Sequence, residues 1–251
     1  MHAAPYIPSA PSTVDEMLRL AEVSASDIVF DLGAGDGRVV IAAARKFGAR
    51  GVGVEIDAAL VERSRASAAQ AGVDGRVRFL QQDLFKTELG EATVIALYLS
   101  PNMNLKLRPV LLGLKPGTRI VSHSADLGDW RPDRRTAIRK DVMLWVVPAR
   151  IAGRWRGQFG VPPRPLEISF SQRYQEISAS ARLASAPVQV WDARLESDRV
   201  SFVIVADLDR DDEASLYFEG RVIPSAIEGT VARGVGTARS TGRWRAERLE
   251  P

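Results

Sequence analysis

The sequence contains no cysteine and only two histidines, His2 and His123. Without thiols there is no disulfide, no thiolate metal ligand and no cysteine nucleophile, and two histidines are too few to suggest a zinc centre, so we predict no metal site. No apolar run approaches the roughly 18 residues of a membrane span, and residues 1–11 lack the charged and apolar regions of a secretory signal. These absences predict a cytoplasmic protein, with a trimmed leader left open as an alternative.

An excess of one charge sign is also missing, because 34 basic residues oppose 31 acidic ones and leave a formal net charge of +3. The basic residues are spread along the chain instead of forming one stripe, which is typical of solvated faces, and we therefore expect no nucleic-acid partner. A chain of 251 residues with 45% hydrophobic and 26% charged residues is typical of a folded globular protein with one large domain or two unequal ones.

The first part of the sequence alternates short apolar runs with helical patterns. Apolar runs at 28–32, 51–55, 77–80, 93–97 and 119–122 predict strands, and helices are predicted at 14–22, after Arg38, at 58–71 and at 105–114. Strands and helices alternating at this spacing predict a Rossmann-like, doubly wound, mostly parallel α/β sheet in residues 1–149. The run at 142–148 is expected to add a later strand, as an antiparallel edge of that sheet.

From about Ala149 onward polar and apolar residues alternate without a helical period, for example at 167–174, 176–183 and 200–206. This pattern predicts a second, small antiparallel β-domain in residues 150–251. The tetrad Gly-Arg-Trp-Arg occurs at 153–156 and again at 242–245. Either the first and last strands lie side by side in a closed barrel, or the repeat is chance in an arginine-rich chain. The sequence does not indicate what this domain does, and it leaves the oligomeric state open.

The most informative segment follows the first predicted sheet strand and reads Asp31-Leu32-Gly33-Ala34-Gly35-Asp36-Gly37-Arg38. Glycines here let the backbone approach a ligand at the carboxyl ends of the strands. A dinucleotide fingerprint would place its third glycine where Arg38 stands, and the carboxylates of Asp31 and Asp36 would repel a pyrophosphate. The segment therefore disfavours a dinucleotide.

Acids at the ends of three successive strands favour a cationic ligand instead. S-adenosylmethionine (SAM) carries an ammonium and a sulfonium but no phosphate, which suits Asp31 near the glycine-rich turn. Glu55, at the end of the second strand, is expected to accept the ribose hydroxyl protons, and Asp83, after the third, to accept from the adenine amine. Each acid alone is also explained as a cap, a solvated strand end or a turn residue, but the three together predict a SAM site.

Three blocks, Asp31 to Arg38, Gly53-Val54-Glu55-Ile56-Asp57 and Gln82-Asp83-Leu84, resemble motif I, post I and motif II of class I SAM methyltransferases. The opening Pro5-Tyr6-Ile7-Pro8, the glycine-rich block and Trp130-x-Pro132-Asp133 are similar to the small lysine methyltransferase family that includes the mitochondrial ATP-synthase c-subunit enzyme, and more distantly to Dot1-type enzymes. The β-rich region has no counterpart in those mitochondrial enzymes, which leaves the acceptor open. The resemblance implies a set of cofactor-binding residues: Tyr6, Asp31, Gly33, Ala34, Gly35, Asp36, Glu55, Ile56, Asp83, Leu84 and Tyr98.

Methyl transfer from a sulfonium needs few catalytic groups, because the enzyme mainly aligns the nucleophile and removes a proton. Tyr98, Ser100 and Asn102 follow the fourth strand and are candidates to orient the acceptor, although Tyr98 packing on the sheet and a helix cap at Ser100–Asn102 explain them equally well. His123 is a candidate base, since imidazoles titrate near neutrality, or a structural hydrogen-bonding residue. Tyr6 is a candidate lid residue or an N-terminal anchor.

The sequence thus predicts a SAM-dependent methyltransferase whose acceptor is a protein lysine. A small-molecule N- or O-methyltransferase and a SAM-sensing binding module are the alternatives.

Overall fold

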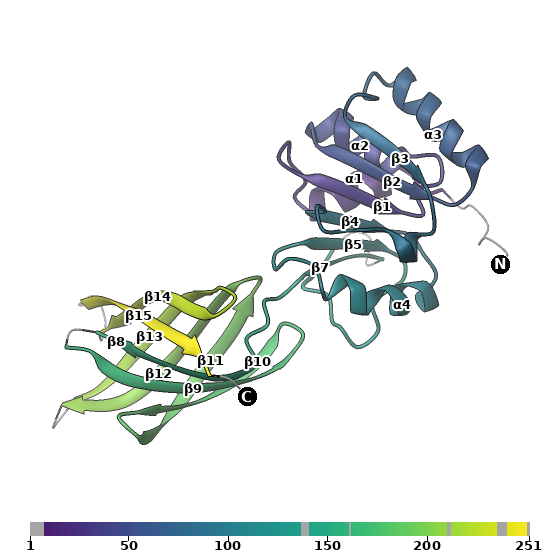
Figure 1. The fold of residues 1–251 in the computed structure, drawn as a ribbon. Coiled ribbons are helices and arrows are strands. Elements are labelled where there is room, and N and C mark those ends of the chain that lie inside the picture. The colour runs from purple at the N-terminus through teal and green to yellow at the C-terminus, as the bar shows by residue number, and fades with distance from the viewer. Residues whose placement is uncertain (1–7, 137–140, 161, 210–211, 235–239, 250–251) are drawn as a thin grey trace. The chain divides into compact units, whose positions relative to one another are not determined.

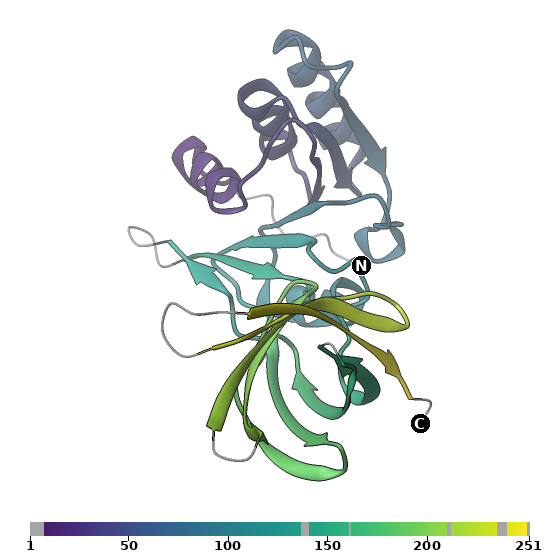
Figure 2. The ribbon, with the colours of Figure 1, turned by 90° about the vertical axis from the view of Figure 1, so that its left-hand side faces the viewer.

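The computed structural model describes residues 8–136, 141–160, 162–209, 212–234 and 240–249 (Figures 1 and 2). Tyr6 lies outside this range. The chain divides into two compact units, Met1–Val147 and Pro148–Pro251, which are described separately below.

The first unit is built on a seven-stranded sheet in the order β3-β2-β1-β4-β5-β7-β6. The strands β1 to β5 run parallel, whereas β7 pairs antiparallel with β5, and β6 antiparallel with β7. This arrangement confirms the predicted Rossmann-like sheet with an antiparallel strand near its edge. The strands are β1 (Ile28–Leu32), β2 (Arg50–Glu55), β3 (Val77–Gln81), β4 (Val94–Leu97), β5 (Arg119–His123), β6 (Arg134–Arg135) and β7 (Val142–Val146).

Helices cover both faces of this sheet. The crossover from β1 to β2 and the crossover from β4 to β5 run toward opposite edges, so right-handed connections place their helices on opposite faces. The helices are α1 (Pro11–Leu20), α2 (Arg38–Phe47), α3 (Ala58–Gln70) and α4 (Pro101–Leu111), with a short 3₁₀ helix, η1 (Leu84–Lys86). The helices α1 and α4 begin three or four residues earlier than predicted, because Pro11 and Pro101 each occupy a first-turn position that needs no backbone N–H.

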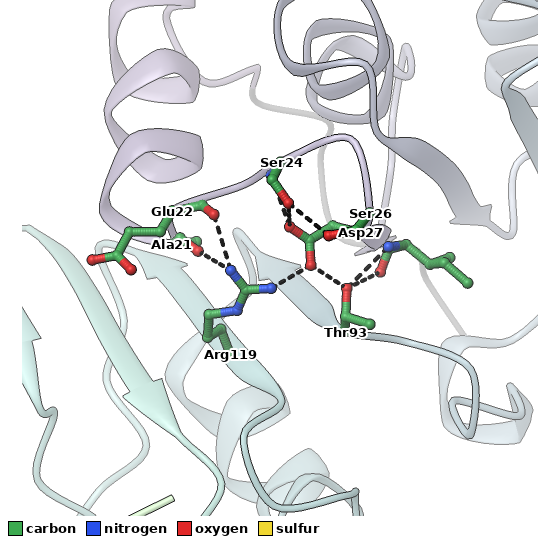
Figure 3. Close-up of polar contacts among 8 residues, drawn as sticks. Ala21, Glu22, Ser24, Ser26, Asp27, Thr93 and Arg119 are labelled. Atoms are coloured by element: carbon green, nitrogen blue, oxygen red, sulfur yellow. Dashed lines mark hydrogen bonds and ion pairs between the residues drawn. The ribbon is translucent and has the colours of Figure 1, made fainter.

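A buried ion pair stabilises the amino edge of the sheet, where β1, β4 and β5 begin (Figure 3). The Asp27 carboxylate pairs with the Arg119 guanidinium and accepts hydrogen bonds from the Thr93 hydroxyl at 2.7 Å and the Ser24 backbone N–H at 2.8 Å. Burial alone would raise the pKa of the Asp27 carboxyl, but these hydrogen bonds and the arginine charge together hold that pKa below its usual value. Arg119 also donates to the Ala21 carbonyl at 2.7 Å, which ties the end of α1 to β5.

The second unit is a closed antiparallel barrel of eight strands. The strand β8 pairs with β15, with Trp155 opposite Arg248 and Phe159 opposite Trp244, so the first and last strands lie side by side and the predicted barrel-like domain is confirmed. The strands are β8 (Gly153–Phe159), β9 (Arg164–Arg173), β10 (Glu176–Leu183), β11 (Ala186–Glu196), β12 (Arg199–Asp209), β13 (Asp212–Val222), β14 (Ala226–Arg233) and β15 (Ser240–Arg248).

Aromatic side chains fill the inside of the barrel. The Phe202 and Phe218 rings stack with their centroids 4.8 Å apart, and Trp244 meets both rings edge-on. Trp155 is also fully buried, whereas Trp191 lies on the outside with 57% of its surface exposed. Every basic residue of this unit is an arginine, since the lysines, at positions 46, 86, 106, 115 and 140, all fall in the first unit.

Candidate active site

The glycine-rich turn is fastened to the end of β2 by backbone hydrogen bonds. The N–H groups of Gly33 and Ala34 both donate to the Val54 carbonyl, at 2.8 and 2.9 Å, and the Gly35 N–H donates to Glu55 Oε2 at 2.9 Å. The other carboxylate oxygen of Glu55 accepts from the N–H groups of Ile56 and Asp57 at 2.8 and 3.0 Å. Three backbone donors therefore fix the Glu55 carboxylate at the carboxyl edge of the sheet.

Two glycines around the turn are required by close packing against Phe79. Gly37 has φ +77°, and a Cβ there would lie 2.6 Å from Phe79 Cε1. A Cβ on Gly53 would lie 2.5 Å from Phe79 Cδ1. No larger residue fits at either position without movement of the aromatic ring, so the turn lies directly against the sheet.

Asp31 is an acid of the site whose pKa is strongly raised. Its side chain lies at the end of β1 and the residue is only 5% exposed. Burial, followed by the negative charges of Glu55 and Asp36, raises the pKa of the Asp31 carboxyl to about 7. A buried acid surrounded by other acids is stabilised by a cation, and this is the property that a SAM ammonium group would use.

Asp36, which the sequence predicts at the cofactor, is paired with Arg38 in the structure. Both of its oxygens accept from the Arg38 side chain, at 2.9 and 2.7 Å, and Arg38 Nη1 donates to the Ser9 carbonyl at 2.6 Å. Arg38 thus partly neutralises Asp36 and links the turn to the chain before α1. The sequence indicated neither contact, although an Asp-x-Arg spacing at the start of a helix is a signal for such a pair.

Asp83 and two exposed apolar side chains lie at the same edge of the sheet as the glycine-rich turn. The Asp83 carboxylate accepts from the Phe85 N–H at 2.9 Å, which begins η1. Ile56 is 59% exposed after β2, and Phe85 is 42% exposed after β3, while Leu84 is half-buried. Because β2 and β3 are adjacent parallel strands, these side chains belong to one edge of the sheet. The sequence did not single out Phe85, which joins this edge two positions after Asp83.

On the other side of the glycine-rich turn, Tyr98 follows β4 and His123 ends β5, and their rings stack with centroids 4.3 Å apart. His123 Nδ1 lies 3.1 Å from the Ser9 hydroxyl and Nε2 lies 3.3 Å from an Asp141 carboxylate oxygen. Ser100 is the residue before α4 but makes no side-chain capping hydrogen bond, and Asn102 is exposed in the first turn of that helix.

Asn104, which sequence reasoning did not identify, is fully buried beneath this surface. Its Nδ2 donates to the Ala125 and Asp126 carbonyls at 3.1 and 3.2 Å, whereas its Oδ1 has no partner among the described residues. The side chain therefore anchors α4 to the loop after β5. Among the described residues, no group of three or more acidic or histidine side chains is placed to hold a metal ion.

Residues 31–134 match the family described as the ANTKMT methyltransferase domain. A protein-lysine N-methyltransferase of Saccharolobus islandicus is 42% identical over 130 residues, which cover 51% of this chain and 81% of that relative. The chain belongs to the ANTKMT methyltransferase family. It is a SAM-dependent methyltransferase, as predicted. Its relatives belong to the lysine methyltransferase family that its motifs resemble.

Other members and structures agree with this assignment. The human lysine N-methyltransferase of the ATP-synthase c-subunit is 32% identical over 146 residues, which cover 58% of this chain and 61% of the human protein. A crystal structure described as an RNA methyltransferase from Salinibacter ruber in complex with S-adenosyl-L-homocysteine is 51% identical, with a TM-score of 0.56, and the match covers 58% of this chain and 96% of that one. In the described part of this chain, the helices are too short or too polar to cross a membrane.

Proposed function

We propose that this ANTKMT-family chain transfers the methyl group of SAM to lysine side chains of a protein acceptor in the cytoplasm. The similarity to the Saccharolobus islandicus protein-lysine N-methyltransferase carries the proposal, since this chain covers 81% of that relative. SAM binding and methyl transfer are assigned to residues 1–149, within which the family match lies.

The residues at the carboxyl edge suit the cofactor. Asp31 is buried among acids, and this supports its assignment as the partner of the SAM ammonium group. Glu55, already oriented by backbone N–H groups, keeps acceptor capacity for ribose hydroxyls, and Ile56 and Phe85 offer apolar surface to the adenine. When bound, SAM supplies a methyl group on a positively charged sulfur, which is an activated leaving group.

The acceptor amine has to reach this methyl group in line and in its neutral form. A lysine ammonium loses its proton near pH 10 in water, so the site must favour the neutral amine. We assign the holding of the amine to Tyr98, Ser100 and Asn102, which lie in the turn before α4 and in its first turn. Tyr6 remains a predicted lid residue.

Transfer to RNA is a second candidate, because the 51% identical Salinibacter ruber structure is described as an RNA methyltransferase. The near-balanced charge of the present chain favours a protein acceptor over a polyanion. Both candidates use the same SAM site and differ only in the acceptor.

The deciding experiment incubates the full chain with SAM labelled in its methyl group and with separate pools of protein and RNA from one lysate. Label in protein, recovered as methyl-lysine after hydrolysis, is the expected result. Asp31→Asn should lose this label, whereas Asp74→Asn, which alters an exposed acid in the turn before β3, should keep it. Label in RNA alone would replace lysine by RNA as the acceptor. SAM binding without a labelled macromolecule would favour a small-molecule acceptor or a SAM-sensing role.

A further inference from the structure

Tyr98 and His123 lie side by side at the carboxyl ends of the neighbouring strands β4 and β5. Because Leu97 pairs with Ser122 in the parallel ladder, Tyr98, which directly follows β4, lies next to His123, the last residue of β5, at the carboxyl edge. Their rings stack at 4.3 Å with an angle of 29° between planes. The imidazole ring thus packs against one face of the Tyr98 ring, and 37% of the tyrosine surface is exposed.

Both nitrogens of His123 are already engaged. Nδ1 is 3.1 Å from the Ser9 hydroxyl, and Nε2 is 3.3 Å from an Asp141 carboxylate oxygen. A ring that donates from Nε2 to Asp141 and accepts at Nδ1 from Ser9 satisfies both contacts, with the tautomer assigned from this network. Only 12% of the histidine side chain is exposed, so neither nitrogen is presented to an acceptor as a free base would be.

We propose that His123 is a positioning residue, which fixes the Tyr98 ring against the acceptor and does not itself remove the proton. The inference rests on the proposed methyl transfer to an acceptor at Tyr98. Ser9 and Asp141 hold the imidazole from two sides, and the imidazole holds the phenol ring by its flat face. A small movement of Tyr98 would lower the rate of methyl transfer, because the amine must attack the methyl carbon in line with the bond that breaks.

The same contacts join the acceptor side to the glycine-rich turn. The Ser9 hydroxyl contacts His123 while the Ser9 carbonyl accepts from Arg38, whose guanidinium binds Asp36 in the turn. Ser9 is only 6% exposed. A chain of polar contacts therefore runs from Asp36 through Arg38 and Ser9 to His123, whose ring stacks on Tyr98.

Two substitutions distinguish positioning from proton transfer. His123→Phe keeps a flat ring against Tyr98 but has no nitrogen, whereas His123→Ala removes the ring. If His123 positions Tyr98, His123→Phe should lose less kcat than His123→Ala, which should lose about tenfold or more, and both variants should keep the shape of the pH profile. Loss of at least about 100-fold in His123→Phe, together with loss of one limb of the pH profile, would assign His123 as the base and overturn the proposal.

A spectroscopic measurement tests the contact without any acceptor. The chain has four tyrosines, so incorporation of 3-fluorotyrosine gives few fluorine signals, and Tyr98→Phe identifies the signal of position 98. His123→Ala should shift that signal and leave the others in place, because the imidazole ring lies directly on the phenol. An unmoved signal, or full methylation activity in His123→Ala, would contradict the inference. Absence of lysine methylation by the unaltered chain would instead contradict the proposed function, whatever the fluorine signal does.

Discussion

The affinity of the chain for SAM should rise between pH 5 and pH 7, because the Asp31 carboxyl must be ionised to pair with the ammonium group. In the unliganded protein, burial and two neighbouring acids raise the pKa of Asp31 to about 7. Binding of the cation favours the ionised form, so each binding event below that pH has to release a proton. Protons and SAM therefore compete for the same buried carboxylate.

The size of the effect follows from this value. At pH 5, two units below a pKa of about 7, roughly one molecule in 100 has an ionised Asp31, so SAM should bind about 100-fold more weakly than on the alkaline plateau. The logarithm of the association constant should then rise by about one per pH unit below about pH 6. Near pH 6, about 0.9 proton should be released for each SAM bound.

Titration calorimetry in buffers of different ionisation enthalpy measures both quantities. Methylthioadenosine, which lacks the amino-acid portion of SAM, is the matched ligand, and its affinity should not follow this pH dependence. Asp31→Asn should bind SAM weakly at every pH in the range. An affinity for SAM that is constant from pH 5 to 7, with no proton release, would refute the pairing of Asp31 with the ammonium group.

Three further predictions concern stability. Without SAM, Asp31→Asn should raise the free energy of unfolding by up to about 4 kcal/mol at pH 8 but not at pH 4. The reason is that the pKa of Asp31 is about 7 in the folded chain against an ordinary value of 3.8, so the carboxyl makes the folded chain less stable as pH rises through that interval. Urea unfolding at both pH values measures this. Arg119→Met should cost about 2 to 3 kcal/mol at pH 7 by leaving Asp27 buried without its partner, and the cost should shrink as acid protonates Asp27; an unchanged melting temperature at pH 7 would contradict this. Gly37→Ala should lower the melting temperature more than Gly72→Ala, since both have positive φ but only the methyl group at Gly37 meets an aromatic ring, at 2.6 Å; equal losses would show that the ring moves aside.

Much of the fold could be predicted because strand and helix periods differ clearly in this sequence. The parallel sheet followed from apolar runs separated by helical segments, and the antiparallel β-domain followed from the alternation after Ala149, whereas its closure into a barrel had only the repeated Gly-Arg-Trp-Arg tetrad to suggest it. Helix starts were less accurate, since Pro11 and Pro101 indicate extended backbone when taken alone but occupy first-turn positions in α1 and α4. Only tertiary contacts decide between these two uses of proline.

The candidate site was predictable where chemistry lies in consecutive residues and not where it depends on distant ones. The glycine-rich turn and Glu55 could be identified from spacing, and the structure adds that hydrogen bonds join them. The pairing of Asp36 with Arg38, and of His123 with Ser9 over 114 positions, could not be predicted from one sequence. The assignment of individual residues to SAM or to the acceptor stays a prediction until the variants above are measured.

Because every lysine lies in the first unit, the two units differ in their reactivity toward amine-directed reagents. An amine-reactive dye or biotin reagent has targets at the chain's amino terminus and at positions 46, 86, 106, 115 and 140, but none in residues 148–251. An immobilised or fluorescent form of the enzyme could thus be prepared with an unmodified barrel surface, exposed Trp191 included. Any methyl-lysine that the enzyme placed on its own copies would likewise fall within the unit that carries the active site.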